Sequence, residues 1–124
     1  MLINFSNHPS EYWPERQLKE TLESFGEVID IQFPEVNPQG DEKYIKNLSE
    51  EYSEKCVKII SDSKDSTNAV HIMGEFNFCF AVISILIRKG IKCIASTSER
   101  IAIEDLLGEK MSKFSFVKFR EYKL

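Results

Sequence analysis

The sequence has only three cysteines, and none of them stands at the spacing of a metal-binding motif. Two of them, Cys79 and Cys93, lie within apolar runs. A thiol in apolar surroundings is a poor nucleophile because burial opposes formation of the thiolate. We therefore predict that Cys56, Cys79 and Cys93 are reduced, buried residues of a cytoplasmic protein and that the chain has no metal site.

Positive charge is also in short supply. The chain has 16 Lys and Arg residues against 20 Asp and Glu residues, for a net charge of −4. A protein that binds duplex DNA needs a basic face to neutralise the phosphates, so duplex DNA is not an expected partner. This shortage leaves room for a small pocket that holds a nucleotide through a few local donors.

Long apolar runs and the common cofactor motifs are missing as well. The most apolar segment, Phe78 to Ile87, is much shorter than the roughly 20 residues of a membrane span. No G-x-G-x-x-G follows the first expected strand, which argues against a typical dinucleotide cofactor. Phosphate-binding P-loop, zinc and G-x-S-x-G patterns are also absent, and we predict no cofactor.

What the sequence does have is a central unit at residues 69–90. An apolar strand at residues 69–73 is followed by Gly74 and Glu75 and then by a helix that is apolar almost all round. Such a helix has no face suited to water. We therefore expect it to be covered on two sides.

The rest of the chain alternates between strand and helix patterns. We expect strands at residues 2–5, 28–33, 69–73 and 91–95. We expect helices from Glu11 to about Phe25, with Ser10 as N-cap, and at residues 41–61 and 76–89. Residues 96–100 read as an exit loop, and residues 101–104 and 113–119 as the two arms of a β-hairpin.

This alternation predicts one α/β domain over residues 1–124, with a three-layer Rossmann-like fold, a mostly parallel sheet and a C-terminal β-hairpin. The first, third and fourth strands should be central, and the last arm should lie at an edge.

In such sheets ligands bind outside the carboxyl ends of the strands, which turns scattered residues into one candidate site. Hydroxyls, an amide, backbone N–H groups and an arginine suit phosphate or ribose. The expected ligand-binding residues are Ser6, Asn7, Ser10, Gly74, Thr97 and Ser98, and the expected catalytic residues are Arg100, His8 and Glu75.

Several of these residues also have a purely structural interpretation. Ser10 fits a helix N-cap, and Glu75 fits either a general base or a carboxylate that stabilises the following helix. Arg100 either clamps an anion or pairs with a neighbouring acid. His71, inside a strand, is expected to be a hydrogen-bonded core or edge group.

The helix around Phe78–Ile87 predicts a homodimer. Its single polar residue is Ser84, and a symmetric contact would bury the same helix of both chains. The alternative is that the second helix or the terminal hairpin covers it within one chain.

The polar loop from Asn4 to Ser10, the hydroxyl-plus-arginine segment from Ser96 to Arg100 and the terminal hairpin resemble small CRISPR-associated proteins with a CARF-like domain, including stand-alone ring nucleases. Ser96 to Arg100 together with residues 114–122 also resemble the end of a group of prokaryotic proteins found in that setting.

The resemblance implies a dimer that binds a cyclic oligoadenylate across its two-fold axis. It implies that Ser6, Asn7 and Ser10 hold phosphate or ribose, that Arg100 stabilises charge, and that His8 or Glu75 assists proton transfer. Cleavage would proceed without metal, by attack of a ribose 2′-hydroxyl on the adjacent phosphate. The sequence departs from this pattern in having Arg100 as its only basic residue there, flanked by Glu99, which weakens anion binding.

Two other functions fit the same residues. One is a nucleoside- or nucleotide-processing enzyme at this rim, with Glu75 as nucleophile or base. The other is a non-catalytic protein-interaction domain, whose apolar helix and hairpin bind a partner chain.

Overall fold

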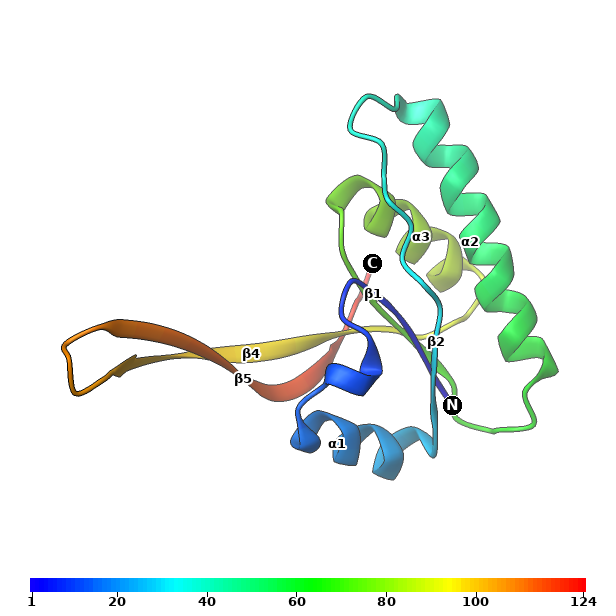
Figure 1. Cartoon of the computed structure of the whole chain (residues 1–124). Coiled ribbons are helices and arrows are strands. Elements are labelled where there is room, and N and C mark those ends of the chain that lie inside the picture. Colours follow the sequence, from blue (N-terminus) through cyan, green and yellow to red (C-terminus); the bar gives the residue numbers. More distant parts are fainter.

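The computed structural model describes all of residues 1–124. Its helices are α1 (Glu15–Phe25), α2 (Glu42–Asp62) and α3 (Phe76–Arg88), and its strands are β1 (Leu2–Ser6), β2 (Val28–Asp30), β3 (Ala69–Met73), β4 (Cys93–Glu104) and β5 (Lys110–Glu121). Helix α1 covers one face of the sheet, and α2 and α3 cover the other (Figure 1). No helix has both the length and the apolar character needed to cross a membrane.

The strand order is β2-β1-β3-β4-β5. Strands β2, β1, β3 and β4 are parallel to one another, and β5 is antiparallel to β4. The predicted α/β fold with a mostly parallel sheet and a C-terminal hairpin is therefore confirmed. The three strands expected at the centre lie there, and β5 forms one edge.

Side-chain alternation along the strands separates the two faces. Ile3 and Phe5 of β1 join the larger core under α2 and α3, whereas Leu2 joins the smaller core under α1. Phe5 packs against a ring of aromatic side chains from other elements: Phe33, Tyr52 and Phe78. This contact between rings ties the sheet to both helices of that layer.

Helix α1 begins later than expected, and Ser10 does not cap it. Residues Ser10–Tyr12 form a short 3₁₀ turn, and Pro14 is the N-cap of the helix. A residue before proline is driven out of the helical region, and Trp13 is accordingly extended, at φ −67° and ψ 146°. Trp13 still packs under α1, with 7% of its surface exposed.

The second strand ends at Asp30 rather than at residue 33. Beyond that point the chain leaves the sheet, and the Phe33 ring packs 5.0 Å from Phe5 and 5.4 Å from Phe78. Gly74 is required beneath this ring, because a Cβ atom there would collide with Phe33.

The largest difference from expectation is that residues 96–100 are not a loop. Strand β4 runs from Cys93 to Glu104 and pairs with β5 from Ile94 onward, with one register irregularity between Thr97 and Ser98. In a purely parallel sheet the end of the fourth strand would lack backbone hydrogen bonds. Here the antiparallel partner β5 supplies them. The outer part of this hairpin projects from the body as a long arm (Figure 1).

Helix α3 is covered largely within the chain. Helix α2 packs along it, and the C-terminal residues Tyr122 to Leu124 lie beside its outer face. Phe78, Val82 and Leu86 are fully buried, whereas Phe76 is 90% exposed and Phe80 is 71% exposed. The alternative of cover within one chain thus accounts for most of this helix, and two phenylalanines remain in solvent.

Candidate functional site

The order of the strands reverses between β1 and β3. From β1 the chain passes through α1 to β2 on one side, and from β3 it passes through α3 to β4 on the other. Ligands of doubly wound α/β proteins bind outside the carboxyl ends of the strands at such a point. Polar side chains lie there on the α1 face of three adjacent strands: Asn4 and Ser6 of β1, His71 of β3 and Ser96 of β4.

Four of the polar side chains in this region form a continuous hydrogen-bonded chain, which we call the polar relay: Asp30, Asn4, His71 and Ser96. Asn4 Nδ2 donates to Asp30 Oδ1 at 3.0 Å. Asn4 Oδ1 lies 3.0 Å from His71 Nδ1, and His71 Nε2 lies 3.2 Å from Ser96 Oγ. The relay therefore crosses four adjacent strands, from β2 to β4.

The bonds of Asn4 determine the tautomer of His71. Asn4 Nδ2 also donates to the carbonyl oxygen of His8 at 2.8 Å, so the amide oxygen is the atom that faces the imidazole. An amide oxygen only accepts hydrogen bonds, so the proton of neutral His71 must be on Nδ1. The lone pair of Nε2 then points to Ser96 Oγ, which donates to it in preference to Met73 Sδ at 3.1 Å, a weaker acceptor.

Burial keeps His71 neutral. The side chain is 1% exposed, and its pKa is lowered to about 4, mainly because burial penalises the charged form and further because His8 is close. Trp13 packs edge-on against the imidazole with 5.1 Å between ring centroids. The expectation that His71 is a hydrogen-bonded core group is confirmed.

An open pocket of about 440 Å³ lies over the Ser96 end of the relay. We call it the strand-end pocket. It is lined by His8, Tyr12, Trp13, Pro14, Gln17, His71, Met73, Ser96, Ser98 and Phe114. The indole N–H of Trp13 donates to the carbonyl oxygen of His8 at 2.9 Å and so anchors the loop after β1 against the pocket wall.

A second hollow, of about 500 Å³, lies across the end of β1. Asn4, Ser6, Asn7 and Asp30 supply its polar lining. The loop after β1 stands between the two hollows, since Asn7 lines one of them and His8 lines the other.

The structure brings only part of the expected site together. Ser6, Asn7, His8 and Ser98 line one or other of these two hollows. Ser10 lies beside them, but its hydroxyl donates to Asp30 Oδ2 at 3.0 Å. The hydroxyl of Thr97 is engaged with the Lys118 backbone on the edge strand.

Gly74 and Glu75 lie on the other side of the sheet, at the start of α3. Glu75 is the N-cap of that helix, and its carboxylate accepts from the backbone N–H groups of Asn77 and Phe78 at 3.2 and 2.7 Å. Gly74 lines a separate, apolar groove. The structural interpretation of Glu75 thus has direct support in the geometry.

Arg100 is not on a loop, because residues 96–100 belong to β4. Its guanidinium donates to Ser112 Oγ at 3.0 and 2.8 Å and forms no ion pair with Glu99 or Glu104. In the hairpin Arg100 is paired with Phe114, a residue of the strand-end pocket. The guanidinium is directed along the arm toward Ser112, and Arg100 is not among the residues that line the pocket.

Asn4, His71 and Ser96 were not predicted to act together. Asn4 and His71 are polar residues within apolar strand patterns, and that position is the signal in the sequence that marks them, whereas Ser96 belongs to the segment expected to be an exit loop. Their common register could not be read before the strand order was known. No three His, Cys, Asp or Glu side chains come together in a way that would hold a metal ion.

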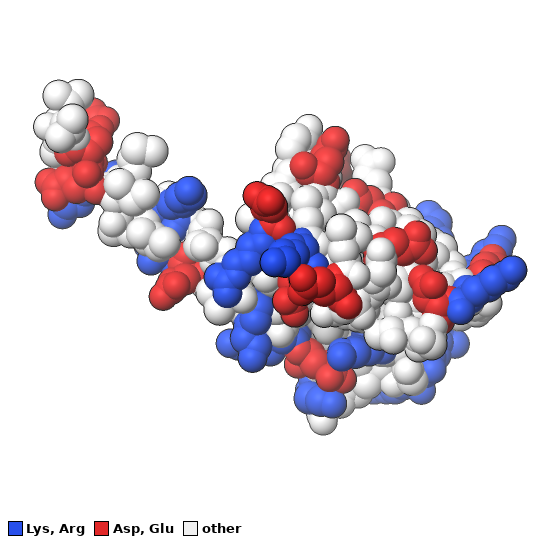
Figure 2. Space-filling model, turned by 90° about the horizontal axis from the view of Figure 1, so that it is seen from below, with Lys and Arg blue, Asp and Glu red and all other residues white.

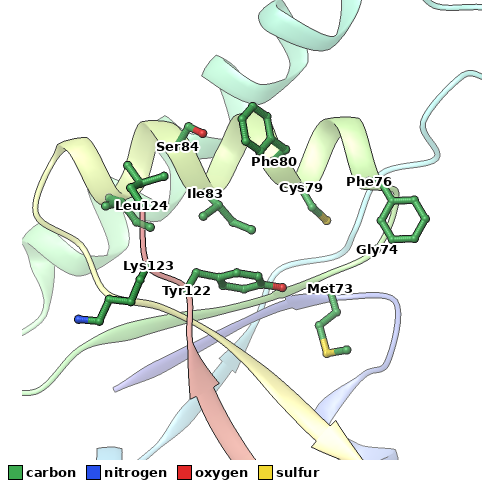
Figure 3. A pocket seen from close by; sticks show the side chains of 11 residues that line it. Met73, Gly74, Phe76, Cys79, Phe80, Ile83, Ser84, Tyr122, Lys123 and Leu124 are labelled. Atoms are coloured by element: carbon green, nitrogen blue, oxygen red, sulfur yellow. The ribbon is translucent and has the colours of Figure 1, made fainter.

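The groove beside α3 is of a different kind. It measures about 370 Å³ and lies between α3 and the C-terminal residues (Figure 3). Cys79 and Ile83 point from α3 toward Tyr122, and the Tyr122 hydroxyl donates to the carbonyl oxygen of Ile72 at 2.9 Å. Burial raises the pKa of Cys79 to about 12, as it does for Cys56 and Cys93, so the thiol in this groove is inert.

Comparisons with known proteins place the chain in one family. No curated protein and no solved structure matches it. One family model matches residues 1–120, nearly the whole chain, and its description is "Uncharacterized protein MJ1673 family". The match covers all three helices, every strand except the last residue of β5, and all the residues that line the strand-end pocket and the second hollow. The chain therefore belongs to the MJ1673 family.

Proposed function

We propose that this protein binds a nucleotide in the strand-end pocket and that the ligand is a cyclic oligoadenylate, as in CRISPR-associated CARF-like domains. The observation that carries the proposal is the position of the pocket, which opens at the carboxyl end of β3, next to Ser96 and Ser98 of β4 and beside the point where the strand order reverses. Its volume of about 440 Å³ lies within the range of small-molecule sites.

The lining of the pocket suits a nucleotide chemically. Tyr12 and Phe114 are 77% and 64% exposed and offer aromatic surface on which an adenine base can stack. Stacking of a base on an aromatic side chain contributes about 1–3 kcal/mol. Ser96, Ser98 and Gln17 supply hydrogen-bonding groups for ribose and phosphate.

The distribution of charge fits a small ligand better than a duplex. Lys and Arg side chains gather where the arm joins the body, but acidic side chains are interspersed among them, and the tip of the arm is largely acidic (Figure 2). Such a surface has no broad basic face for a duplex. Arg100 forms no ion pair, and its guanidinium would turn from Ser112 toward the pocket to meet a phosphate.

Ring-nuclease activity is part of the same proposal. Cleavage would need the ribose 2′-hydroxyl to be held in line with the phosphate, and Arg100 to stabilise the charge that develops on it. His8 lines the pocket and is available for proton transfer. Glu75 is the residue that an alternative nucleoside-processing enzyme would need, and its carboxylate is engaged in capping α3.

Ligand binding can be tested by thermal shift with cyclic and linear oligoadenylates, mononucleotides and nucleosides. A cyclic oligoadenylate should raise the melting temperature. Arg100→Ala should weaken its affinity about tenfold or more, because a hydrogen bond to a charged group contributes about 1.5–3 kcal/mol. Arg88→Ala, an exposed arginine on α3, is the matched control and should leave the affinity unchanged.

Other results would favour the other functions. A shift with nucleosides or mononucleotides alone would indicate the nucleoside-processing enzyme. A flat response to the whole panel would contradict nucleotide binding and favour the protein-interaction domain.

We also propose that the chain forms a homodimer through α3. Phe76 and Phe80 expose apolar surface beside the groove, and Phe76 lies at the start of α3, next to the carboxyl end of β3. A two-fold contact there would bury the same exposed apolar residues of both protomers.

Phe80→Glu should dissociate this dimer. Burial of a phenylalanine contributes about 1.5–3 kcal/mol, and the substitution acts twice across a two-fold axis, so dimer affinity should fall at least about a hundredfold. Sedimentation velocity over a range of concentrations measures this directly. Leu22→Glu, at an exposed apolar residue of α1, is the control. A monomeric mass for the unmodified chain at every concentration would contradict the proposal.

A further inference from the structure

We propose that Ser96 and His71 form the proton acceptor of a phosphodiester-cleaving site, with Ser96 Oγ contacting the ligand and His71 Nε2 receiving the proton. The substrate class is a phosphodiester flanked by a ribose 2′-hydroxyl. This inference rests on the proposed function, because it requires that a nucleotide occupies the strand-end pocket.

The two residues have the geometry that general-base catalysis needs. His71 Nε2 carries no proton in the tautomer that Asn4 imposes, and it lies 3.2 Å from Ser96 Oγ. A base within hydrogen-bond reach, oriented by a third group, is the arrangement found wherever a hydroxyl is activated in enzymes. Asn4 is that third group, and Asp30 holds Asn4 in turn at 3.0 Å.

Burial explains why the transfer must pass through Ser96. The His71 side chain is 1% exposed, whereas Ser96 is partly exposed in the floor of the pocket. A bound ribose can reach the serine hydroxyl but has little access to the imidazole. Ser96 therefore passes its own proton to His71 while it accepts one from the ligand.

The reaction balances without a metal or a redox partner. The ribose 2′-oxygen forms a bond to phosphorus, and the bond from phosphorus to the 5′-oxygen breaks. The proton of the 2′-hydroxyl moves to Ser96 Oγ, and the proton of Ser96 moves to His71 Nε2. The 5′-oxygen takes a proton from water, His71 returns its proton to solvent, and the products are a 2′,3′-cyclic phosphate and a 5′-hydroxyl.

The groups around His71 determine how cleavage by the unmodified chain depends on pH. The titratable groups nearest His71 are His8, on the loop after β1, and Asp30, which reaches it through Asn4. The neighbours that α1 and β5 contribute, Gln17 and Phe119, are uncharged. Because the pKa of His71 is about 4, the base is already unprotonated at pH 6, and the cleavage rate should be flat from pH 6 to pH 8.

A paired exchange can shift that profile. Asn4→Asp combined with Asp30→Asn puts a carboxylate against Nδ1 of His71 and keeps an amide partner at position 30. The adjacent negative charge should raise the pKa of His71 toward neutrality, and the cleavage rate should then fall as the pH drops below that value. A network that merely holds the strands together would leave the profile flat.

The decisive experiment measures binding and cleavage in the same samples. Cyclic oligoadenylates of several ring sizes and their 2′-deoxy analogues are added to the unmodified chain and to the variants Ser96→Ala, His71→Gln and Ser61→Ala. Thermal shift reports binding, and chromatography reports products. Ser61, an exposed serine of α2, provides the matched control.

We expect the unmodified chain and Ser61→Ala to bind and cleave the ribose ligand and to bind the deoxy analogue without cleaving it. Ser96→Ala should still bind but should cleave at least about a hundredfold more slowly, because a general base contributes a factor of about 10²–10⁴. His71→Gln tests the same step where its melting curve shows a folded protein. If Ser96→Ala binds and cleaves as fast as the unmodified chain, the proton-accepting role of Ser96 and His71 is overturned while the proposed function stands. The same follows if the unmodified chain binds a ligand but cleaves none. If no probe binds, the proposed function itself is overturned.

Discussion

His71→Gln is expected to remove a loss of stability of about 3 kcal/mol that the protein undergoes between pH 7 and pH 4. The pKa of His71 is about 4 in the folded chain and about 6.5 when the side chain is free in water. Between those values the unfolded chain takes up a proton that the folded protein does not, so protons favour unfolding. The free energy of unfolding should therefore fall by about 3 kcal/mol from pH 7 to pH 4 through this residue alone.

Urea denaturation of the two proteins at a series of pH values measures the difference. Carboxylates also titrate in this range, and subtracting the curve of His71→Gln from that of the unmodified chain removes their contribution. His8→Gln, at the exposed histidine, should keep most of the pH dependence. Identical slopes for the unmodified chain and His71→Gln would show that burial does not depress the pKa of His71.

Leu86→Ala is expected to be the most destabilising single truncation of the α3 core outside the aromatic residues. Leu86 is 0% exposed and belongs to the core between α3 and the sheet. Removing a buried leucine side chain leaves a cavity, and the free energy of unfolding should fall by about 2–5 kcal/mol.

The matched control for this truncation is Leu107→Ala at the tip of the arm, where the leucine is 86% exposed. Its effect should stay within about 0.5 kcal/mol, because no packing is lost. Chemical denaturation with equal slopes for both variants gives the comparison. A large loss at Leu107 would mean that the arm is packed against something in solution, which would itself support an association of chains through the arm.

Much of the architecture could be predicted from local pattern. The apolar strand before Gly74 and Glu75, the amphipathic residues of α2 and the aromatic alternation before Glu121 each carry their own periodicity. Parallel strands joined by helices have few arrangements. For that reason the central strands and the edge hairpin could be predicted from the sequence.

The candidate site was harder to predict. Thr97, Ser98 and Arg100 have the composition of a loop, and only the antiparallel partner β5 makes them strand residues. The sequence around Glu75 fits a catalytic base as well as a helix cap. Its carboxylate accepts hydrogen bonds from two backbone N–H groups of α3, which supports the role of a cap. Pro14 displaced the start of α1 because it restricts the residue before it.

The sequence by itself determined most of the strands and helices, because those depend on neighbours a few residues apart along the chain. It also determined that Asn4 and His71 are polar residues placed inside apolar strands. Only the tertiary structure decided that they meet, since Asn4 and His71 are 67 positions apart and His71 and Ser96 are 25 apart. Their contact follows from strand order and register, which depend on how α1, α2 and α3 bury the two faces of the whole sheet.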